Sequence, residues 1–73
     1  MHAFIHKIKT ILDDKKTEYI TADNTRMFIR FDETSQYYVI SAGALFITFD
    51  NYVAEKDCIK LYEREHYIGS LRV

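Results

Sequence analysis

The spacing of hydrophobic residues changes once along this 73-residue chain, from the period of a helix to the period of a strand. Within residues 3–15, hydrophobic side chains recur at positions i, i+1, i+4, i+7 and i+8, which is the stripe of an amphipathic helix. This stripe consists of Phe4, Ile5, Ile8, Ile11 and Leu12. From residue 18 onward the period is two, which is typical of strands. The pattern predicts an α+β fold with an N-terminal amphipathic helix packed on one face of a small antiparallel sheet of about five or six strands.

The expected strands are separated by short polar segments or by glycine. They cover residues 18–22, 26–32, 37–42, 45–49, 58–63 and 66–73. Residues 44–56 have a second interpretation, because Leu45, Phe49 and Tyr52 also fit a helical stripe. The β-branched and aromatic content of residues 46–49 favours a strand followed by a polar loop over residues 50–57.

Chain length and cysteine content limit how the fold is stabilised. Residues 1–73 predict a single small domain, which buries only about 60% of the surface that its unfolded chain exposes. Cys58 is the only cysteine, so no disulfide can form within the chain. A partner subunit is then the most direct additional source of stability. Without a signal segment or a long apolar run, we expect a cytoplasmic protein that does not enter a membrane.

Residues 26–31 give one strand two chemically different faces, because side chains alternate sides along a strand. The first face is ordinary core and holds Met27, Ile29 and Phe31. The second face holds Arg26, Phe28 and Arg30. A sheet face turned toward water normally shows polar residues, so an aromatic ring between two guanidinium groups indicates a recognition surface.

We extend this surface to aromatic residues on the neighbouring strands. The predicted partner-binding residues are Arg26, Phe28, Arg30, Tyr37, Phe46 and Tyr62. Aromatic residues and arginine are enriched at the energetically dominant positions of protein interfaces. The sequence therefore predicts a non-catalytic protein-interaction module that self-associates through a sheet face or edge, for example as a homodimer.

Single-stranded nucleic acid is an alternative ligand for the same surface. An arginine-flanked ring with nearby tyrosines resembles a base-stacking platform. The chain contains 10 Lys and Arg against 11 Asp and Glu, so its net charge of −1 supplies no general attraction to a polyanion. Nucleic acid is disfavoured for this reason. If the helix covered this face, Phe28 would be a core residue instead.

Catalytic, metal-binding and cofactor-binding patterns are weak. The three serines do not lie in a nucleophile-elbow pattern, and the chain has no glycine-rich phosphate loop. His2 and His6 have the i, i+4 spacing that lets two imidazoles reach one ion, but no third ligand accompanies them at a suitable step. We therefore predict no enzyme activity, no catalytic residue, no metal site and no cofactor, and we expect Cys58 to be a small half-buried strand residue.

The order of elements, a helix followed by a sheet, resembles that of small accessory proteins of phages and plasmids, including some that inhibit host defence. This resemblance implies an alternative function, an inhibitor that docks on a host enzyme. The acidic residues are scattered among basic ones, so mimicry of DNA is not indicated.

Overall fold

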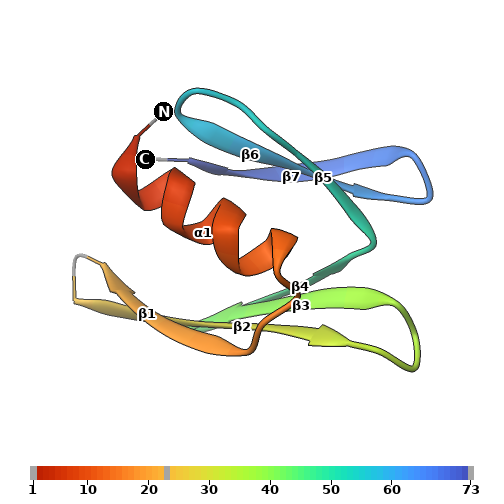
Figure 1. Ribbon diagram of the computed structural model, residues 1–73, viewed down its shortest axis with the longest axis horizontal. Coiled ribbons are helices and arrows are strands. Elements are labelled where there is room, and N and C mark those ends of the chain that lie inside the picture. Colours follow the sequence, from red (N-terminus) through yellow and green to blue (C-terminus); the bar gives the residue numbers. More distant parts are fainter. Residues whose placement is uncertain (1, 23, 73) are drawn as a thin grey trace.

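The computed structural model describes residues 2–22 and 24–72, in which one helix is followed by seven strands (Figure 1). The elements are α1 (Ala3–Asp13), β1 (Glu18–Ala22), β2 (Thr25–Asp32), β3 (Tyr37–Ala42), β4 (Leu45–Phe49), β5 (Asn51–Ala54), β6 (Cys58–Glu63) and β7 (His66–Arg72). The predicted α+β class is confirmed, with the strands divided between two sheets where one sheet of five or six strands was expected. No helix in the described ranges is long and apolar enough to span a bilayer.

Consecutive strands pair antiparallel within each sheet. The four-stranded sheet has the order β1-β2-β3-β4, and the three-stranded sheet has the order β5-β6-β7. The chain passes between the sheets at Asp50, whose backbone N–H donates to the carbonyl of Tyr62 at 3.1 Å. Both carboxylate oxygens of Asp50 accept the backbone N–H of Arg64 at 3.2 Å. These contacts hold the bend between β4 and β5, and therefore split the expected single sheet in two.

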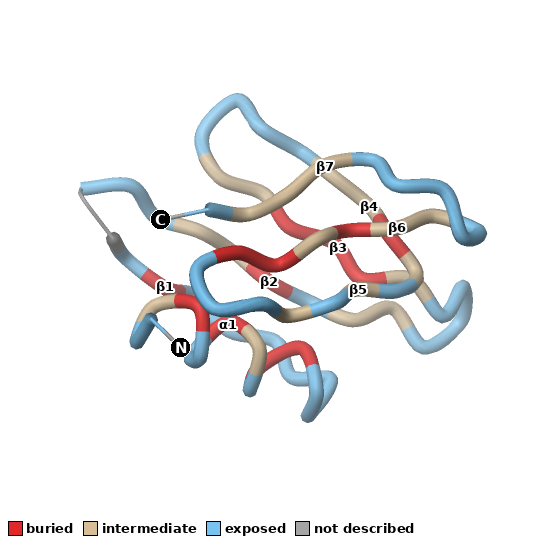
Figure 2. The backbone as a smooth tube through the Cα atoms, turned by 90° about the horizontal axis from the view of Figure 1, so that it is seen from above, coloured by how far each residue is buried: buried red, intermediate tan, exposed pale blue. Residues whose placement is uncertain are grey.

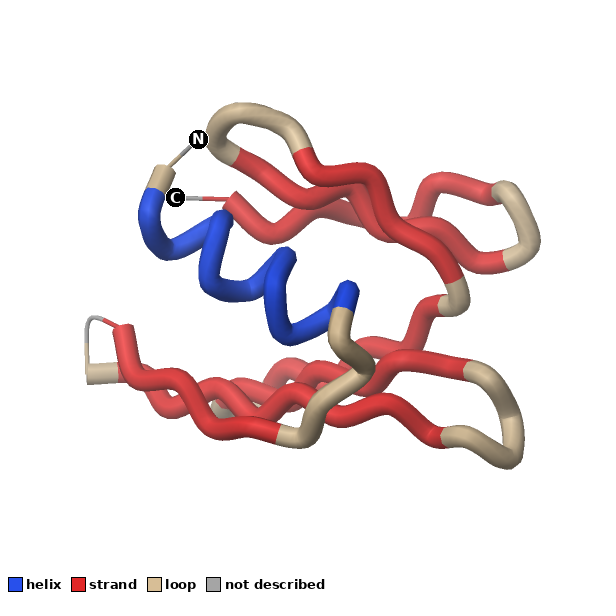
Figure 3. Tube along the Cα trace, viewed as in Figure 1, coloured by secondary structure: helices blue, strands red, loops and turns tan. Residues whose placement is uncertain are grey.

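Helix α1 lies between the two sheets and fills the space that they enclose (Figures 1 and 3). Ile5, Ile8 and Leu12 on its apolar stripe are fully buried, and α1 contacts both β2 and β6. The strands contribute buried residues to the same core, namely Ile20, Ile29, Tyr38, Ile40, Phe49, Ile59 and Leu61. Figure 2 shows these buried segments in the middle of the molecule, with exposed turns around them. The helix therefore covers the inner face of β2, and Phe28 lies on the opposite face.

Both ends of the helix are fixed by local hydrogen bonds. The Nδ1 atom of His2 accepts the backbone N–H of Phe4 at 3.1 Å, so this imidazole acts as the N-cap. At the other end Lys15 has a φ of 53°, a left-handed conformation. Lys15 and Lys16 donate their N–H groups to the carbonyls of Leu12 and Ile11, at 3.1 and 3.2 Å. This closure of the last turn ends the helix at Asp13, slightly before the expected limit at residue 15.

The structure decides between the two interpretations of residues 44–56. The strand interpretation is confirmed for Leu45–Phe49, because β4 pairs along its length with β3, and the helical alternative is wrong. The following segment is not entirely a loop, since Asn51–Ala54 pairs with β6 as β5. The predicted hairpin over residues 58–73 is confirmed by β6 and β7, except for residue 73, which lies outside the described residues.

Candidate functional site on the outer face of the four-stranded sheet

The strand register places three aromatic rings in one row across the four-stranded sheet. Tyr19 pairs with Phe28, Phe28 with Ser41, and Ser41 with Phe46. The adjacent row, which contains Ile29 and Ile40, belongs to the core around α1. Because neighbouring positions of a strand point to opposite faces, the aromatic row faces away from the helix.

Two arginines complete this surface, since Arg26 and Arg30 flank Phe28 on β2 and point to the same side. We call the surface the aromatic-arginine face. It consists of Tyr19, Arg26, Phe28, Arg30 and Phe46.

The side chains at one end of the aromatic-arginine face are ordered against one another. The Tyr19 and Phe28 rings lie 4.7 Å apart between centroids, with an interplanar angle of 39°. The guanidinium carbon of Arg26 lies 4.0 Å from the centroid of the Tyr19 ring, a cation-π contact worth about 0.5–1 kcal/mol at an exposed site. Tyr19 is nevertheless 58% exposed and Phe46 is 68% exposed. The rings therefore offer apolar surface that the fold does not cover.

The positive charges of this face are not neutralised within the part of the chain that the structure describes. The ion pairs found there join Lys9 to Asp13, Lys16 to Asp14 and Lys60 to Glu55, and none involves Arg26 or Arg30. Asp32 lies on the same side of β2, but its carboxylate accepts the Thr34 N–H at 3.2 Å and the Ser35 hydroxyl at 2.9 Å. The face therefore combines exposed rings with two guanidinium groups that have no carboxylate partner among residues 2–22 and 24–72.

The structure brings some of the predicted partner-binding residues together and separates others. Arg26, Phe28, Arg30 and Phe46 lie on one face, as expected. Tyr37, at the start of β3, is half-buried, and its hydroxyl donates to the carboxylate of Glu63 at 3.5 Å.

Tyr62 does not join this face, because it belongs to the three-stranded sheet and packs against Tyr67 with 5.9 Å between ring centroids. It points outward from β6, on the side away from the core residue Leu61. The alternation predicted the outward direction correctly, but it could not show which sheet carries the residue.

Tyr19 was not among the predicted residues, although it forms the most ordered part of the face. The predicted strand began at residue 26, and closing the hairpin there would set Tyr19 opposite Ile29. In the structure β2 begins at Thr25, and this register sets Tyr19 opposite Phe28.

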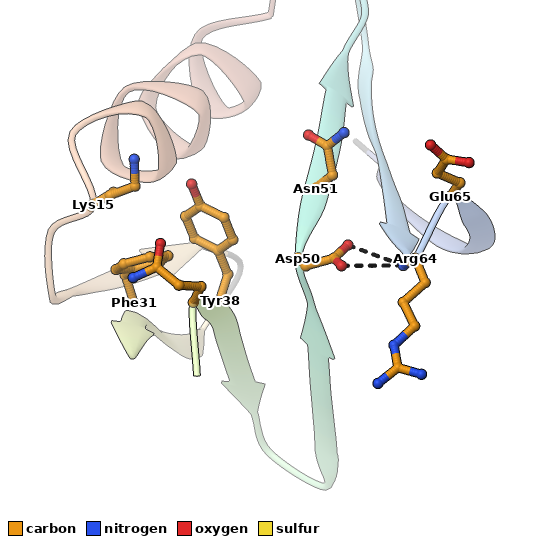
Figure 4. A pocket seen from close by; sticks show the side chains of 8 residues that line it. Lys15, Phe31, Tyr38, Asp50, Asn51, Arg64 and Glu65 are labelled. Atoms are coloured by element: carbon orange, nitrogen blue, oxygen red, sulfur yellow. Dashed lines mark hydrogen bonds between the residues drawn. The ribbon is translucent and has the colours of Figure 1, made fainter. Parts of the chain in front are cut away.

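An open cleft of about 450 Å³ lies between the two sheets, beside the end of the helix (Figure 4). Its lining residues are Lys15, Phe31, Gln36, Tyr38, Asp50, Asn51, Arg64 and Glu65. The Asp50 carboxylate is occupied by the Arg64 N–H, as the dashed lines in Figure 4 show. That bond anchors a turn in which Arg64 and Glu65 have φ values of 50° and 70°, unusual for residues other than glycine. Asp50 and Arg64 therefore stabilise the bend between β4 and β5 and the turn between β6 and β7.

Other titratable groups near the core are also engaged structurally. The Tyr52 hydroxyl donates to the Asp13 carboxylate, and hydrogen bonds from Lys9 and Tyr52 lower the pKa of Asp13. Burial and the bond to Asp13 raise the pKa of Tyr52. Cys58 is buried, not half-buried as expected. Burial and the nearby Glu55 carboxylate raise the pKa of its thiol, which therefore stays protonated near neutral pH.

Comparison with protein-family models, curated proteins and solved structures finds no match to this chain.

Proposed function

We propose that this protein is a non-catalytic protein-interaction module and that the aromatic-arginine face is its binding surface. The supporting observation is that the exposed rings of Tyr19 and Phe46 share a face with Arg26 and Arg30. Neither arginine has an ion-pair partner within the described residues. Exposed aromatic residues and arginines of this kind provide the dominant contacts of many interfaces, because they bury a large area and form directional hydrogen bonds.

The charge of the face indicates the chemistry of the partner. A complementary surface presents carboxylates opposite the two guanidinium groups and apolar side chains opposite Tyr19 and Phe46. Two copies of this chain packed face to face would instead bring arginines toward arginines, which is unfavourable. The partner at this face is therefore a different, locally acidic protein. A host enzyme inhibited by docking is a special case of this proposal.

A single-stranded nucleic acid is the second candidate ligand. The observation that favours it is the Tyr19 and Phe28 ring pair, which lies beside cations that could reach a phosphate backbone. Such binding would weaken steeply with salt, because it releases counterions. A labelled single-stranded oligonucleotide titrated at low and at physiological salt distinguishes this candidate from the acidic protein.

Affinity capture from the native cell, after nuclease treatment, tests the proposed function. The baits are the wild-type protein, the Arg26→Ala/Arg30→Ala variant and a Lys60→Ala control, which removes an exposed cation from the other sheet. We expect a protein retained by the wild type and by the control but absent from the arginine variant. A protein retained equally by all three baits would contradict the proposal. So would a ligand that the wild-type bait retains only when the nuclease treatment is omitted.

A further inference from the structure

Strand β4 is an edge strand without the usual protection against pairing with another chain. Natural proteins guard their edge strands with charges, bulges or very short strands. Here β1 carries Glu18 and β5 has only four residues. Strand β7 ends in the charged Arg72 and has a register shift nearer its start, where Gly69 and Tyr67 pair with Leu61 and Tyr62 of β6. By contrast Leu45–Phe49 has five residues, all apolar or β-branched and none charged. Its composition favours further strand pairing.

The register shows which backbone groups of β4 are free. Ala42 pairs with Leu45 across a two-residue turn, in which Gly43 has a φ of 59°. In such a hairpin the closing pair is hydrogen-bonded and the bonding then alternates along the strands. Ile47 therefore bonds to β3, whereas the N–H and C=O groups of Phe46 and Thr48 point to the open edge.

This edge is accessible from both sides of the sheet. Leu45 and Phe46 point to opposite faces, yet they are 49% and 68% exposed. Among the described residues, β4 pairs through backbone hydrogen bonds with β3 alone.

We propose that the open edge of β4 pairs antiparallel with β4 of a second copy of this chain. A pairing centred on Ile47 sets Phe46 of one copy opposite Thr48 of the other. Each of these pairs exchanges two backbone hydrogen bonds, since both residues direct their polar groups outward. The two strands meet without any charge between them.

The arginines that oppose face-to-face packing do not oppose this arrangement. Strands lie about 4.8 Å apart, and β2 is two strands away from β4. The two β2 strands of the joined sheet are then five spacings apart, roughly 24 Å, well beyond the Debye length of about 8 Å at physiological salt. The dimer also supplies the additional burial that a 73-residue chain lacks, and it sets two aromatic-arginine faces side by side on one continuous sheet.

Light scattering and sedimentation on three proteins test this dimer: the wild type, Thr48→Lys and Thr21→Lys. Thr48 and Thr21 occupy outward positions on opposite edge strands of the same sheet, so the second variant controls for the added lysine. We expect the wild type and Thr21→Lys to have twice the chain mass, and the dissociation constant of Thr48→Lys to rise about tenfold or more. A monomeric wild type over the accessible concentration range overturns the proposal, and so does a dimer that Thr48→Lys leaves unchanged.

Amide hydrogen exchange on the wild type tests the same edge without a substitution. The N–H groups of Phe46 and Thr48 should be protected at high protein concentration and should exchange faster on dilution. Protection that does not depend on concentration, or fast exchange at every concentration, overturns the proposal. The Arg26→Ala/Arg30→Ala variant should remain dimeric, so failure of the dimer and failure of the proposed binding face give different results.

Discussion

The outward faces of the two sheets differ in how their charges are satisfied. On the three-stranded sheet Lys60 is paired with Glu55 at 3.4 Å, and Tyr67 shares a hydrogen bond of 2.5 Å with Ser70. On the four-stranded sheet Arg26 and Arg30 have no carboxylate partner in the described chain. Both faces expose aromatic rings, so exposure alone does not separate them. Arg72, on the outward side of β7, also has no ion pair among the described residues, so the two faces differ in the pairing of Lys60 and in the ring that contacts Arg26.

This comparison separates two roles for charged and aromatic residues. Groups whose partners lie within the chain, such as Asp50 with Arg64, hold the fold in place. Groups without such partners contribute little to stability and are available for binding. Loss of a group of the first kind should lower stability, and loss of a group of the second kind should lower affinity.

The largest expected effect concerns stability and uses two phenylalanines of the same strand. Phe49 is fully buried and stacks on Tyr38 with 5.3 Å between centroids, whereas Phe46 is mostly exposed. Phe49→Ala should lower the free energy of unfolding by about 3–5 kcal/mol. Phe46→Ala should lower it by less than about 0.5 kcal/mol at protein concentrations where the chain is monomeric. Chemical denaturation measures both, and a large loss from Phe46→Ala would show that the outer ring is structural.

The next effect concerns affinity for the captured partner. Arg26→Ala/Arg30→Ala should weaken binding roughly 100-fold, since each arginine would leave an acidic group of the partner unpaired. Lys60→Ala should change the affinity less than about twofold, because its charge is compensated by Glu55. Isothermal titration calorimetry with the isolated partner measures both values. Equal losses in the two variants would remove the distinction between the faces.

A smaller effect compares one exposed ring from each face. Phe46→Ala should weaken partner binding about tenfold, because the ring supplies apolar contact area on the four-stranded sheet. Tyr67→Ala removes a ring of similar exposure, 55%, from the other sheet and should leave the affinity unchanged. The same calorimetric titration measures both, and the opposite ranking would move the binding surface to β5, β6 and β7.

The smallest effect concerns the pH dependence of a paired charge. The pKa of Asp13 is lowered by its bonds to Lys9 and Tyr52, so its contribution to stability is complete above the ordinary Asp range, near pH 4, and is lost as the pH falls through the lowered value. Asp13→Asn should therefore cost less than about 1 kcal/mol at neutral pH, because the pair is exposed to solvent. The difference from the wild type should disappear in acid. Denaturation at both pH values checks this, and Arg26→Ala should show no such pH dependence.

Much of the fold could be predicted from periodicity. The helix stripe correctly predicted that Ile5, Ile8 and Leu12 are buried. The alternation in residues 26–31 correctly predicted which side chains share a face of β2. Division into two sheets could not be predicted, because it depends on Asp50 bonding to Tyr62 and Arg64 far along the chain. Strand β5 was missed because four residues are too few to show a period.

The candidate site was predicted only in part for the same reason. Positions on one strand, such as Arg26, Phe28 and Arg30, follow from alternation alone. For residues on different strands, alternation predicts a shared face only if the strands belong to one sheet. Phe46 lies in the same sheet as β2, whereas Tyr62 does not.

The most direct test of the binding face is an NMR titration of the isotope-labelled protein with its captured partner. Amide and aromatic signals report on both sheets in one experiment. We expect shifts concentrated at Tyr19, Arg26, Phe28, Arg30 and Phe46, with the outward residues of β5, β6 and β7 unchanged. Shifts centred on Val53, Tyr62 and Tyr67 would contradict it.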